Sequence, residues 1–317
     1  LSDRRQRQMC IRDSPYRIWL SEIILQQTQI KQGLPYYLKF IEKYPTVFQL
    51  ADMDEDEILK DWQGLGYYSR ARNLHKTAQY VANELNGIFP KNYKDLIRLR
   101  GVGDYTASAI ASICYEEPVA VLDGNVYRVL SRYFGINTPI NSTNGTKEFK
   151  RLATSLLPKK NIGDYNQAIM EFGALQCKPK SPDCKNCPIA SNCIALSTGN
   201  IHKLPVKLKK NKARKRYLNF LVFLNKNNET IIEKRTQKGI WQHLYQFPMI
   251  ETSKSIKIEQ LLNLDFRQKK TKTFGNIELF NSKDIIHKLS HQELYIKFWK
   301  INTNCHVGDM INLKDIQ

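Results

Sequence analysis

Residues 93–115 read YKDLIRLRGVGDYTASAIASICY and predict two helices joined by a tight hairpin. An amphipathic segment leads into the turn Gly101-Val102-Gly103, and a second helix begins near residue 104 or 105. The two glycines allow the backbone to approach a ligand closely, and the first turn of the new helix offers free N–H groups at a positive dipole end. Such a hairpin can hold one phosphodiester without reading bases. Most G-x-G turns between helices are only tight turns, so the turn by itself is weak evidence for phosphate binding.

The chain around this hairpin reads as helical from residue 14 to about residue 200. Ser14 or the aspartate before it can cap a first helix, and Pro15 suits its first turn. Alternating strand patterns are nearly absent, and glycine and proline separate segments of ordinary helical length. We therefore expect an all-α domain over residues 14–200. Residues 1–13 fit nothing downstream and are treated as an anomalous amino-terminal segment.

A strongly basic segment separates this domain from a different kind of sequence. KLPVKLKKNKARKR, residues 203–216, has eight basic residues and no acid. It can serve as a solvated tether or as a strap on an anionic backbone. Residues 201–215 are therefore predicted as a linker. The segments YLNFLVFL and ELYIKFWKI beyond it are typical of strands, which predicts a smaller α/β domain over residues 216–317.

The composition favours a polyanionic partner. Lys and Arg number 49 against 30 Asp and Glu, which gives a net charge of +19 among 317 residues. An excess of this size indicates nucleic acid first, although a merely soluble basic surface would have the same composition. No apolar run approaches the roughly 18–20 residues that a membrane span requires, so no membrane partner is expected.

Four of the seven cysteines lie within one short polar segment. The spacing is C-x6-C-x2-C-x5-C, formed by Cys177, Cys184, Cys187 and Cys193. Four thiolates at this spacing can hold an iron–sulfur cluster or a zinc ion, and spacing alone leaves both open. An odd total of cysteines and the lack of a secretory segment argue against a disulfide framework.

Two carboxylic acids occupy contrasting surroundings. Glu22 lies in the apolar helix segment IWLSEIIL, where we expect desolvation to raise its pKa and favour the protonated acid. Asp123 follows the run PVAVL and can cap a helix, where backbone N–H groups would keep it ionised. An acid that keeps its proton and a carboxylate that keeps its charge suit the cleavage of an N-glycosidic bond. The sequence does not reveal whether the two converge.

Five motifs in order, together with the cysteine spacing, resemble the adenine DNA glycosylases of the MutY family. The motifs are WLSEIILQQTQI, GLGYYSRARNLHK, LRGVGDYTASAI, VLDGNVYRVL and YNQAIMEFGALQC, followed by the cysteine segment. The resemblance implies a helix–hairpin–helix glycosylase domain with a 4Fe-4S cluster bound by the four cysteines. It further implies a monomeric, cytoplasmic and nucleoid-associated bacterial protein that acts on double-stranded DNA with A:8-oxoG or A:G mispairs.

The resemblance also implies roles for single residues. Glu22 would protonate adenine, chiefly at N7, and Asp123 would meet the resulting sugar cation, with Tyr105 and Asn125 beside them. Bifunctional relatives of the endonuclease III type have lysine at the place of Tyr105, so this chain is expected to release the base without cutting the strand. The DNA-binding residues implied are Gln27, Thr28, Tyr67, Gly101, Val102 and Gly103. Of these, Gln27 and Tyr67 would enter the base stack where adenine is flipped out.

The second domain resembles the MutT-like, Nudix-related domain of the same family. Residues 252–270 contain only Glu259 and Asp265 as acids, so we expect no nucleotide hydrolysis. Ser290 and His291 stand where the family has a loop that recognises 8-oxoguanine. The family's Leu-Pro-Trp-Arg segment is missing before Pro15, and its final helix is expected to be missing after Gln317. The rival hypotheses are a bifunctional pyrimidine-damage glycosylase and a non-catalytic, cluster-bearing DNA-binding protein.

Overall fold

The structure is a computed structural model that describes residues 14–209, 213–264, 275–303 and 310–316. It divides into two compact units, residues 1–209 and 210–317, and each is treated by itself. The anomalous segment expected at residues 1–13 lies outside the described residues. Within the described ranges, no helix is both long and apolar enough to cross a membrane.

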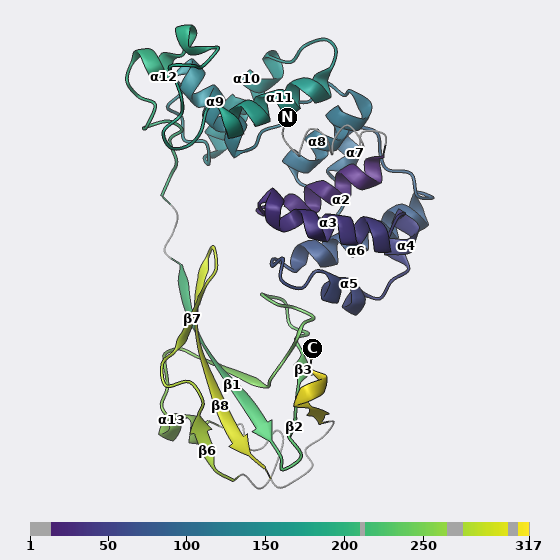
Figure 1. The fold of residues 1–317 in the computed structure, drawn as a ribbon, viewed down its shortest axis with the longest axis vertical. Helices are drawn as coiled ribbons and strands as arrows, with labels where there is room; N and C mark the ends of the chain where they lie inside the picture. The colour runs from purple at the N-terminus through teal and green to yellow at the C-terminus, as the bar shows by residue number, and fades with distance from the viewer. Residues whose placement is uncertain (1–13, 210–212, 265–274, 304–309, 317) are drawn as a thin grey trace. The chain divides into compact units, whose positions relative to one another are not determined.

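The first unit is built from helices, as expected (Figure 1). Their bounds are α2 Pro15–Leu25, α3 Ile30–Lys43, α4 Val47–Ala51, α5 Glu55–Asp61, α6 Ser69–Glu84, α7 Tyr93–Leu96, α8 Asp104–Tyr115, α9 Gly124–Phe134, α10 Thr143–Ser155, α11 Ile162–Leu175, the 3-10 turn Ala190–Asn192 and α12 Ile194–Ser197.

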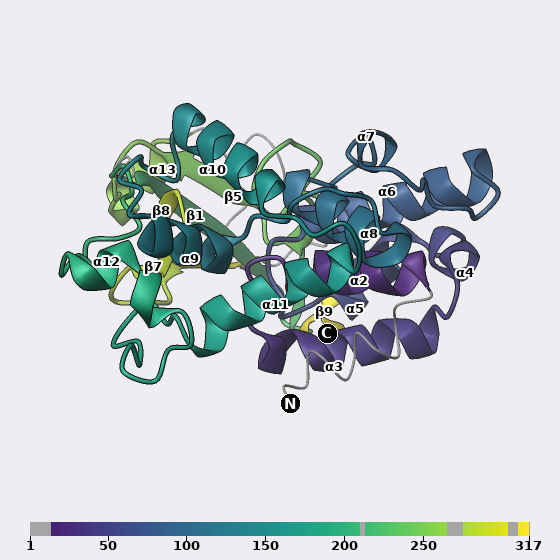
Figure 2. The same ribbon diagram turned by 90° about the horizontal axis from the view of Figure 1, so that it is seen from above.

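The predicted hairpin joins α7 to α8. Gly101 has φ +79°, which favours glycine, and an added Cβ there would lie 2.8 Å from that of Asn73. Gly103 caps α8 with an extended backbone, and Val102 between the two glycines is buried. Helix α8 is almost wholly apolar or small in its middle, and it contacts both α2 and α11 (Figure 2). The hairpin is therefore anchored in the core of the unit while Gly103 faces open space.

The second unit is an α/β arrangement, also as expected. Its elements are β1 Arg214–Leu224, β2 Glu229–Thr230, β3 Glu233–Lys234, β4 Tyr245–Gln246, β5 Met249–Thr252, α13 Ile258–Leu262, β6 Ile277–Leu279, β7 Ile285–Lys288, β8 Gln292–Asn302, β9 Ile311–Asn312 and the 3-10 turn Leu313–Asp315.

The long strands β1 and β8 form the centre of this unit. They pair in parallel from Arg214↔Gln292 to Leu224↔Asn302, and the main sheet has the order β5-β1-β8-β6 with β7 also paired to β8. Alternate residues of both strands face opposite sides of the sheet. Leu221 and Trp299 belong to the core on one side, and Leu218 and Ile296 to the core on the other.

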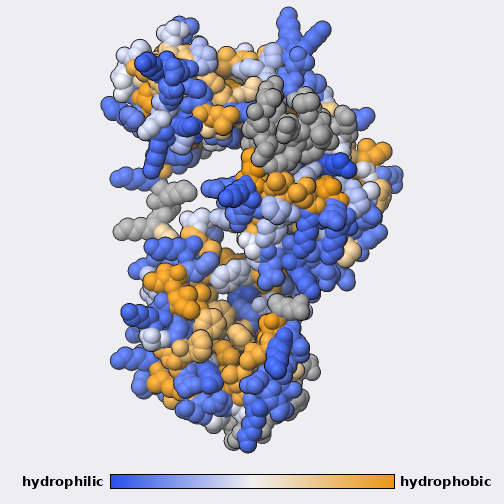
Figure 3. Space-filling model, viewed as in Figure 1, coloured by the Kyte–Doolittle hydropathy of each residue, from blue (hydrophilic) through white to orange (hydrophobic). Residues whose placement is uncertain are grey.

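The segment predicted as a linker is partly bound to the helical unit. Leu204 is buried, Val206 accepts a backbone hydrogen bond from Ile140 (3.0 Å), and Leu208 donates to the side chain of Asn141 (2.7 Å). At its other end, Arg214 already belongs to β1. Hydrogen bonds and strand pairing therefore attach described residues at both ends of this segment to the two units. On the face drawn in Figure 3, hydrophilic residues dominate and apolar patches are separate.

Candidate active site and cysteine pocket

A cavity of about 490 Å³ in the helical unit gathers three of the predicted catalytic residues. Glu22, Tyr105 and Asp123 reach it from three different segments of the chain. Its lining residues are Glu22, Leu25, Gln26, Gln27, Thr28, Ile30, Gly103, Asp104, Tyr105, Thr106, Leu122 and Asp123. The hairpin, the first helix and the cap of α9 therefore meet at one place, and the volume lies in the range of small-ligand sites.

Glu22 is held by the first helix. Ser14 caps α2 by accepting from the Arg17 amide, and Pro15 occupies the first helical position. The helix is buried on nearly all sides, and Glu22 is only 4% exposed although it borders the cavity. A charged carboxylate is costly in such surroundings. The sequence-based prediction of a desolvated acid thus agrees with the burial of this side chain.

Asp123 is the N-cap of α9, as its position before Gly124 suggested. Its Oδ1 accepts from the backbone amides of Asn125 (2.9 Å) and Val126 (2.8 Å). Its Oδ2 accepts from Asn125 Nδ2 at 2.8 Å. Three N–H donors at the helix N-terminus therefore fix the orientation of this carboxyl group. Asn125 does not line the cavity itself, and its side-chain amide bonds to Asp123.

Gln27 and Tyr67 share an unusual backbone conformation. Both are non-glycine residues with positive φ, 54° for Gln27 and 48° for Tyr67, and both side chains are exposed. Residues held in the left-handed region cluster at functional sites. Thr28 lines the cavity, and its hydroxyl donates to the Gln26 carbonyl at 3.2 Å.

Arg70 joins the two segments that hold these residues and was not singled out from the sequence. Its Nη1 donates to the carbonyls of Ile24 (2.9 Å) and Gln26, and its Nη2 donates to that of Gly66 (3.2 Å). The guanidinium also lies 5.7 Å from the centre of the Tyr67 ring. Burial lowers the pKa of Arg70 to about 10, so it remains charged at neutral pH. This one cation therefore ties the end of the Glu22 helix to the Tyr67 loop.

A second residue absent from the sequence-based set connects α2 to α8. Gln26 Nε2 donates to the hydroxyl of Thr106 at 3.1 Å. Thr106 directly follows Tyr105, whose hydroxyl lies 3.8 Å from the sulfur of Met170 in α11. The Gln26–Thr106 hydrogen bond holds the end of α2, the helix that contains Glu22, against α8 on one side of the cavity.

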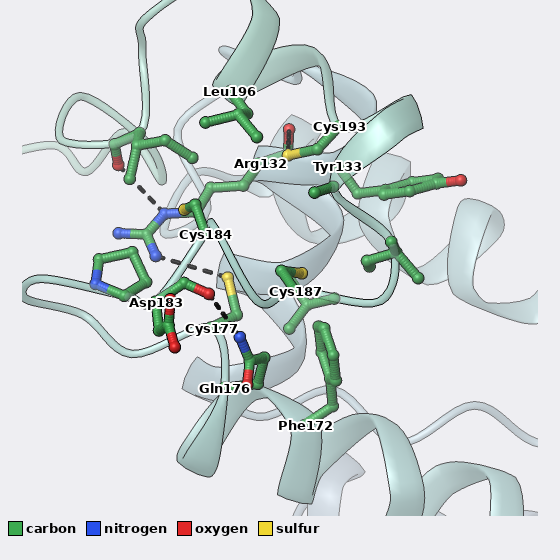
Figure 4. Close-up of a pocket in the computed structure, with 15 residues that line it drawn as sticks. Arg132, Tyr133, Phe172, Gln176, Cys177, Asp183, Cys184, Cys187, Cys193 and Leu196 are labelled. Atoms are coloured by element: carbon green, nitrogen blue, oxygen red, sulfur yellow. Dashed lines mark hydrogen bonds between the residues drawn. The ribbon is translucent and has the colours of Figure 1, made fainter.

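The four clustered cysteines line one separate pocket (Figure 4). Its walls are otherwise mainly apolar, with Phe172 and Leu196 among them. Burial raises the pKa of Cys184, and the negative charge of the other three thiols raises it further. The four cysteines singled out from the sequence therefore lie at one pocket.

Two buried arginines of α9 hold the cysteine segment. Arg132 donates to the sulfur of Cys177 (3.4 Å) and to the carbonyl of Lys178 (2.7 Å). Arg128 donates to the Cys177 carbonyl (2.7 Å) and to Asn125 Oδ1 (2.8 Å). Arg128 thus contacts both the cysteine segment and the partner of Asp123. The sequence signal for it was its place three residues after Asn125, on the same face of the helix.

Helix α11 packs closely on the first turn of α9. A Cβ added to Gly173 would lie 2.7 Å from that of Asn125 and 2.9 Å from its carbonyl oxygen. Only glycine permits this approach, because real Cβ atoms do not come so close. The motif that ends in Cys177 therefore supports the Asp123 cap through packing as well as through Arg128.

In the second unit, Ser290 and His291 lie in the exposed turn between β7 and β8. Their side chains contact each other, with Ser290 Oγ 3.1 Å from His291 Nδ1. The His291 carbonyl accepts from the Arg214 amide at 3.1 Å, so the basic start of β1 lies beside this turn. A polar loop next to a basic strand is suited to contact an anionic partner.

This combination of a helical hairpin, a buried acid and a capped aspartate agrees with comparisons to known proteins. Residues 20–159 match the HhH-GPD superfamily of base excision DNA repair proteins, and residues 219–316 match the NUDIX domain. An adenine DNA glycosylase from Buchnera aphidicola subsp. Baizongia pistaciae (strain Bp) is 38% identical over 286 residues, which cover 90% of this chain and 78% of that protein. The chain belongs to the adenine DNA glycosylase family and is therefore an N-glycosylase.

Solved structures of DNA glycosylases are similar in fold to more than half of this chain. A thermostable thymine-DNA glycosylase has a TM-score of 0.55 and 32% identity, over 59% of this chain and 86% of that one. A non-covalent endonuclease III–DNA complex has a TM-score of 0.52 and 24% identity, over 58% of this chain and 85% of that one. The second likeness is one of fold alone.

Proposed function

We propose that this chain, acting as a monomer, excises adenine mispaired with 8-oxoguanine or guanine in double-stranded DNA. The observation that carries the proposal is the convergence of Glu22, Tyr105 and Asp123 on one cavity beside the hairpin. The curated relatives are named for adenine, which supports the choice of base. The net charge of +19 supports a polyanionic substrate.

The chemistry divides between the two carboxyl groups. Glu22 gives its proton to the leaving adenine, chiefly at N7, since burial disfavours its charged form. Asp123 stabilises the sugar cation that remains, and Asn125 fixes its Oδ2. An adenine must leave the base stack to reach this cavity, at a cost of a few kcal/mol. Gln27, Thr28 and Tyr67 are the residues available to fill the gap and hold the flanking DNA.

We infer that base release is not followed by strand cleavage. A Schiff base requires an amine near the sugar, and a tyrosine cannot form one. Among the described residues that line the cavity there is no lysine, and Tyr105 stands at the hairpin. Hydrolysis to an abasic site is the reaction that these residues support.

The test is a single-turnover assay on duplexes that contain A:8-oxoG, A:G or thymine glycol. We expect base release from the first two, with strand breaks only after alkali treatment. Breaks without alkali would favour a lyase mechanism instead. Release of thymine glycol alone would support the bifunctional pyrimidine-damage glycosylase, and release from no duplex would support a DNA-binding protein without catalysis.

We further propose that Ser290 and His291 recognise the base opposite adenine. Both are exposed in a turn beside the basic strand that begins at Arg214. Each offers a donor or acceptor for a base edge, and one good contact pair gives about 1–3 kcal/mol of discrimination. Comparing base release from A:8-oxoG with base release from A:G in the single-turnover assay measures how strongly the protein discriminates between the two opposite bases.

The four cysteines fit a 4Fe-4S cluster, and we propose that Cys177, Cys184, Cys187 and Cys193 hold one. Their sulfurs surround one pocket, and Arg132 donates to Cys177, which suits a thiolate ligand. The resemblance to the adenine DNA glycosylases favours a 4Fe-4S cluster over zinc at this spacing. The cluster would order the segment at residues 177–193.

Anaerobically purified protein should contain about four iron atoms and matching acid-labile sulfide per chain. Replacing Cys187 with serine should remove most of both, because one of four ligands is lost. Replacing Cys114 with serine should leave both unchanged, since this thiol does not line the cysteine pocket. Stoichiometric zinc in place of iron would contradict the proposal.

A further inference from the structure

The hairpin proposed to hold a DNA phosphate carries an acid in an unfavourable place. Asp104 is the first residue of α8, directly after Gly103, and it lines the cavity. A carboxylate in the first turn stabilises a helix, but it also repels an anionic ligand and competes for the same backbone N–H groups. A phosphate can bind at this turn only if the Asp104 carboxylate is held away from these N–H groups.

Lys150 of α10 lies close enough to Asp104 to fix the position of its carboxylate. Its Nζ donates to Asp104 Oδ1 at 3.1 Å and lies 3.2 Å from Oδ2, and it also donates to Ser108 Oγ (3.1 Å) and the Ala120 carbonyl (2.8 Å). Tyr93 holds the same carboxylate, with its hydroxyl 2.7 Å from Oδ1. The ammonium group is thus shared among the first two turns of α8 and the segment that leads to Asp123.

The pair is only partly exposed, 29% for the Lys150 side chain and 48% for that of Asp104. Ion pairs of this exposure contribute little to the stability of the free protein. Their effect on an approaching phosphate is different, because the charge and the position of Asp104 both matter within a few Å of the ligand.

We propose that Lys150 is a positioning residue for DNA binding, which holds Asp104 away from the free N–H groups of α8 so that a phosphodiester can occupy them. This inference rests on the proposed function, since it requires the hairpin to bind DNA. It differs from a direct Lys150–phosphate contact, in which Lys150 would act independently of Asp104.

A double-mutant cycle separates these two roles. DNA affinity is measured with the full chain and a duplex that carries a non-hydrolysable adenosine analogue opposite 8-oxoguanine. Lys150→Met should weaken binding by roughly tenfold, the effect of one unscreened charge a few Å from a phosphate. In an Asp104→Asn background the same change should weaken binding less than threefold. Equal losses in both backgrounds would overturn the proposal, because a direct contact is additive.

Two matched variants control for charge and structure. Lys147→Met removes the same charge from an exposed position of α10 and should change affinity less than threefold. Lys150→Arg keeps a cation and should retain most of the affinity. If Lys150→Met melts early, Lys150→Gln replaces it in the cycle, because its amide can still donate to the Ala120 carbonyl.

A hairpin variant distinguishes failure of this inference from failure of the proposed function. A Cβ at Gly103 meets no protein atom within 4 Å, and its φ of −96° suits any residue. Gly103→Ala should therefore fold normally and obstruct only the ligand. If it leaves affinity unchanged, the hairpin does not bind the DNA backbone. The role of Lys150 and the phosphate-binding role of the hairpin in the proposed function are then both wrong. If it weakens binding while the cycle is additive, only the role of Lys150 is wrong.

Discussion

Replacing Glu22 with glutamine should abolish base release while DNA binding stays nearly intact. The amide keeps the size and hydrogen-bonding capacity of the acid, but it cannot donate the proton that the leaving adenine needs. General acid catalysis contributes about 10²–10⁴ to a rate, so we expect a loss in this range in a single-turnover assay on A:8-oxoG. More than a tenth of the wild-type rate would remove Glu22 from its catalytic role.

The burial of Glu22 makes this variant informative. At 4% exposure the side chain lies against the apolar body of α2, where a neutral amide is tolerated better than a carboxylate. Glu42→Gln on the exposed face of α3 is the matched control and should leave the rate unchanged. A melting temperature close to that of the wild type would assign the lost rate to chemistry.

The features that could be predicted from the sequence were those determined by residues close together in the chain, such as turns and helix caps. The hairpin followed from two glycines before an apolar helix, and the Asp123 cap followed from an aspartate before Gly-Asn at the end of an apolar run. Both are present in the structure. The strands β1 and β8 likewise followed from two segments that are typical of strands, although their parallel pairing did not.

The residues that were missed act through contacts between distant segments. Arg70 and Arg128 read as ordinary charges in amphipathic helices, and an exposed helix face is the usual place for an arginine. Their function in the structure depends on carbonyl groups 44 and 49 residues away in sequence. The helical periodicity of the sequence gives no sign of a hydrogen bond between an arginine and a carbonyl group so far along the chain. Residues 203–208 were similarly predicted as part of a linker, because the residues that they pair with, Ile140 and Asn141, lie far away in sequence.

Replacing Asp123 with asparagine should reduce the rate of base release by about 10²–10³, the usual effect of removing one group that stabilises transition-state charge. Asparagine caps helices as well as aspartate does, so the bonds from the Asn125 and Val126 amides can persist. The charge that faces the sugar cation is lost. The bond from Asn125 Nδ2 to Oδ2 is also at risk, since an amide nitrogen there cannot accept it.

A second variant separates the charge of Asp123 from its capping role. Ser142 caps α10 by accepting from the Gly145 amide at 3.0 Å, and it does not line the cavity. Ser142→Ala should therefore lower the free energy of unfolding by about 1 kcal/mol and leave the single-turnover rate unchanged. Asp123→Asn should do the opposite, with a small change in stability and a large change in rate. If Asp123→Asn instead retained more than a tenth of the wild-type rate, the aspartate would be only a helix cap, and the sugar cation would have to be stabilised by another group.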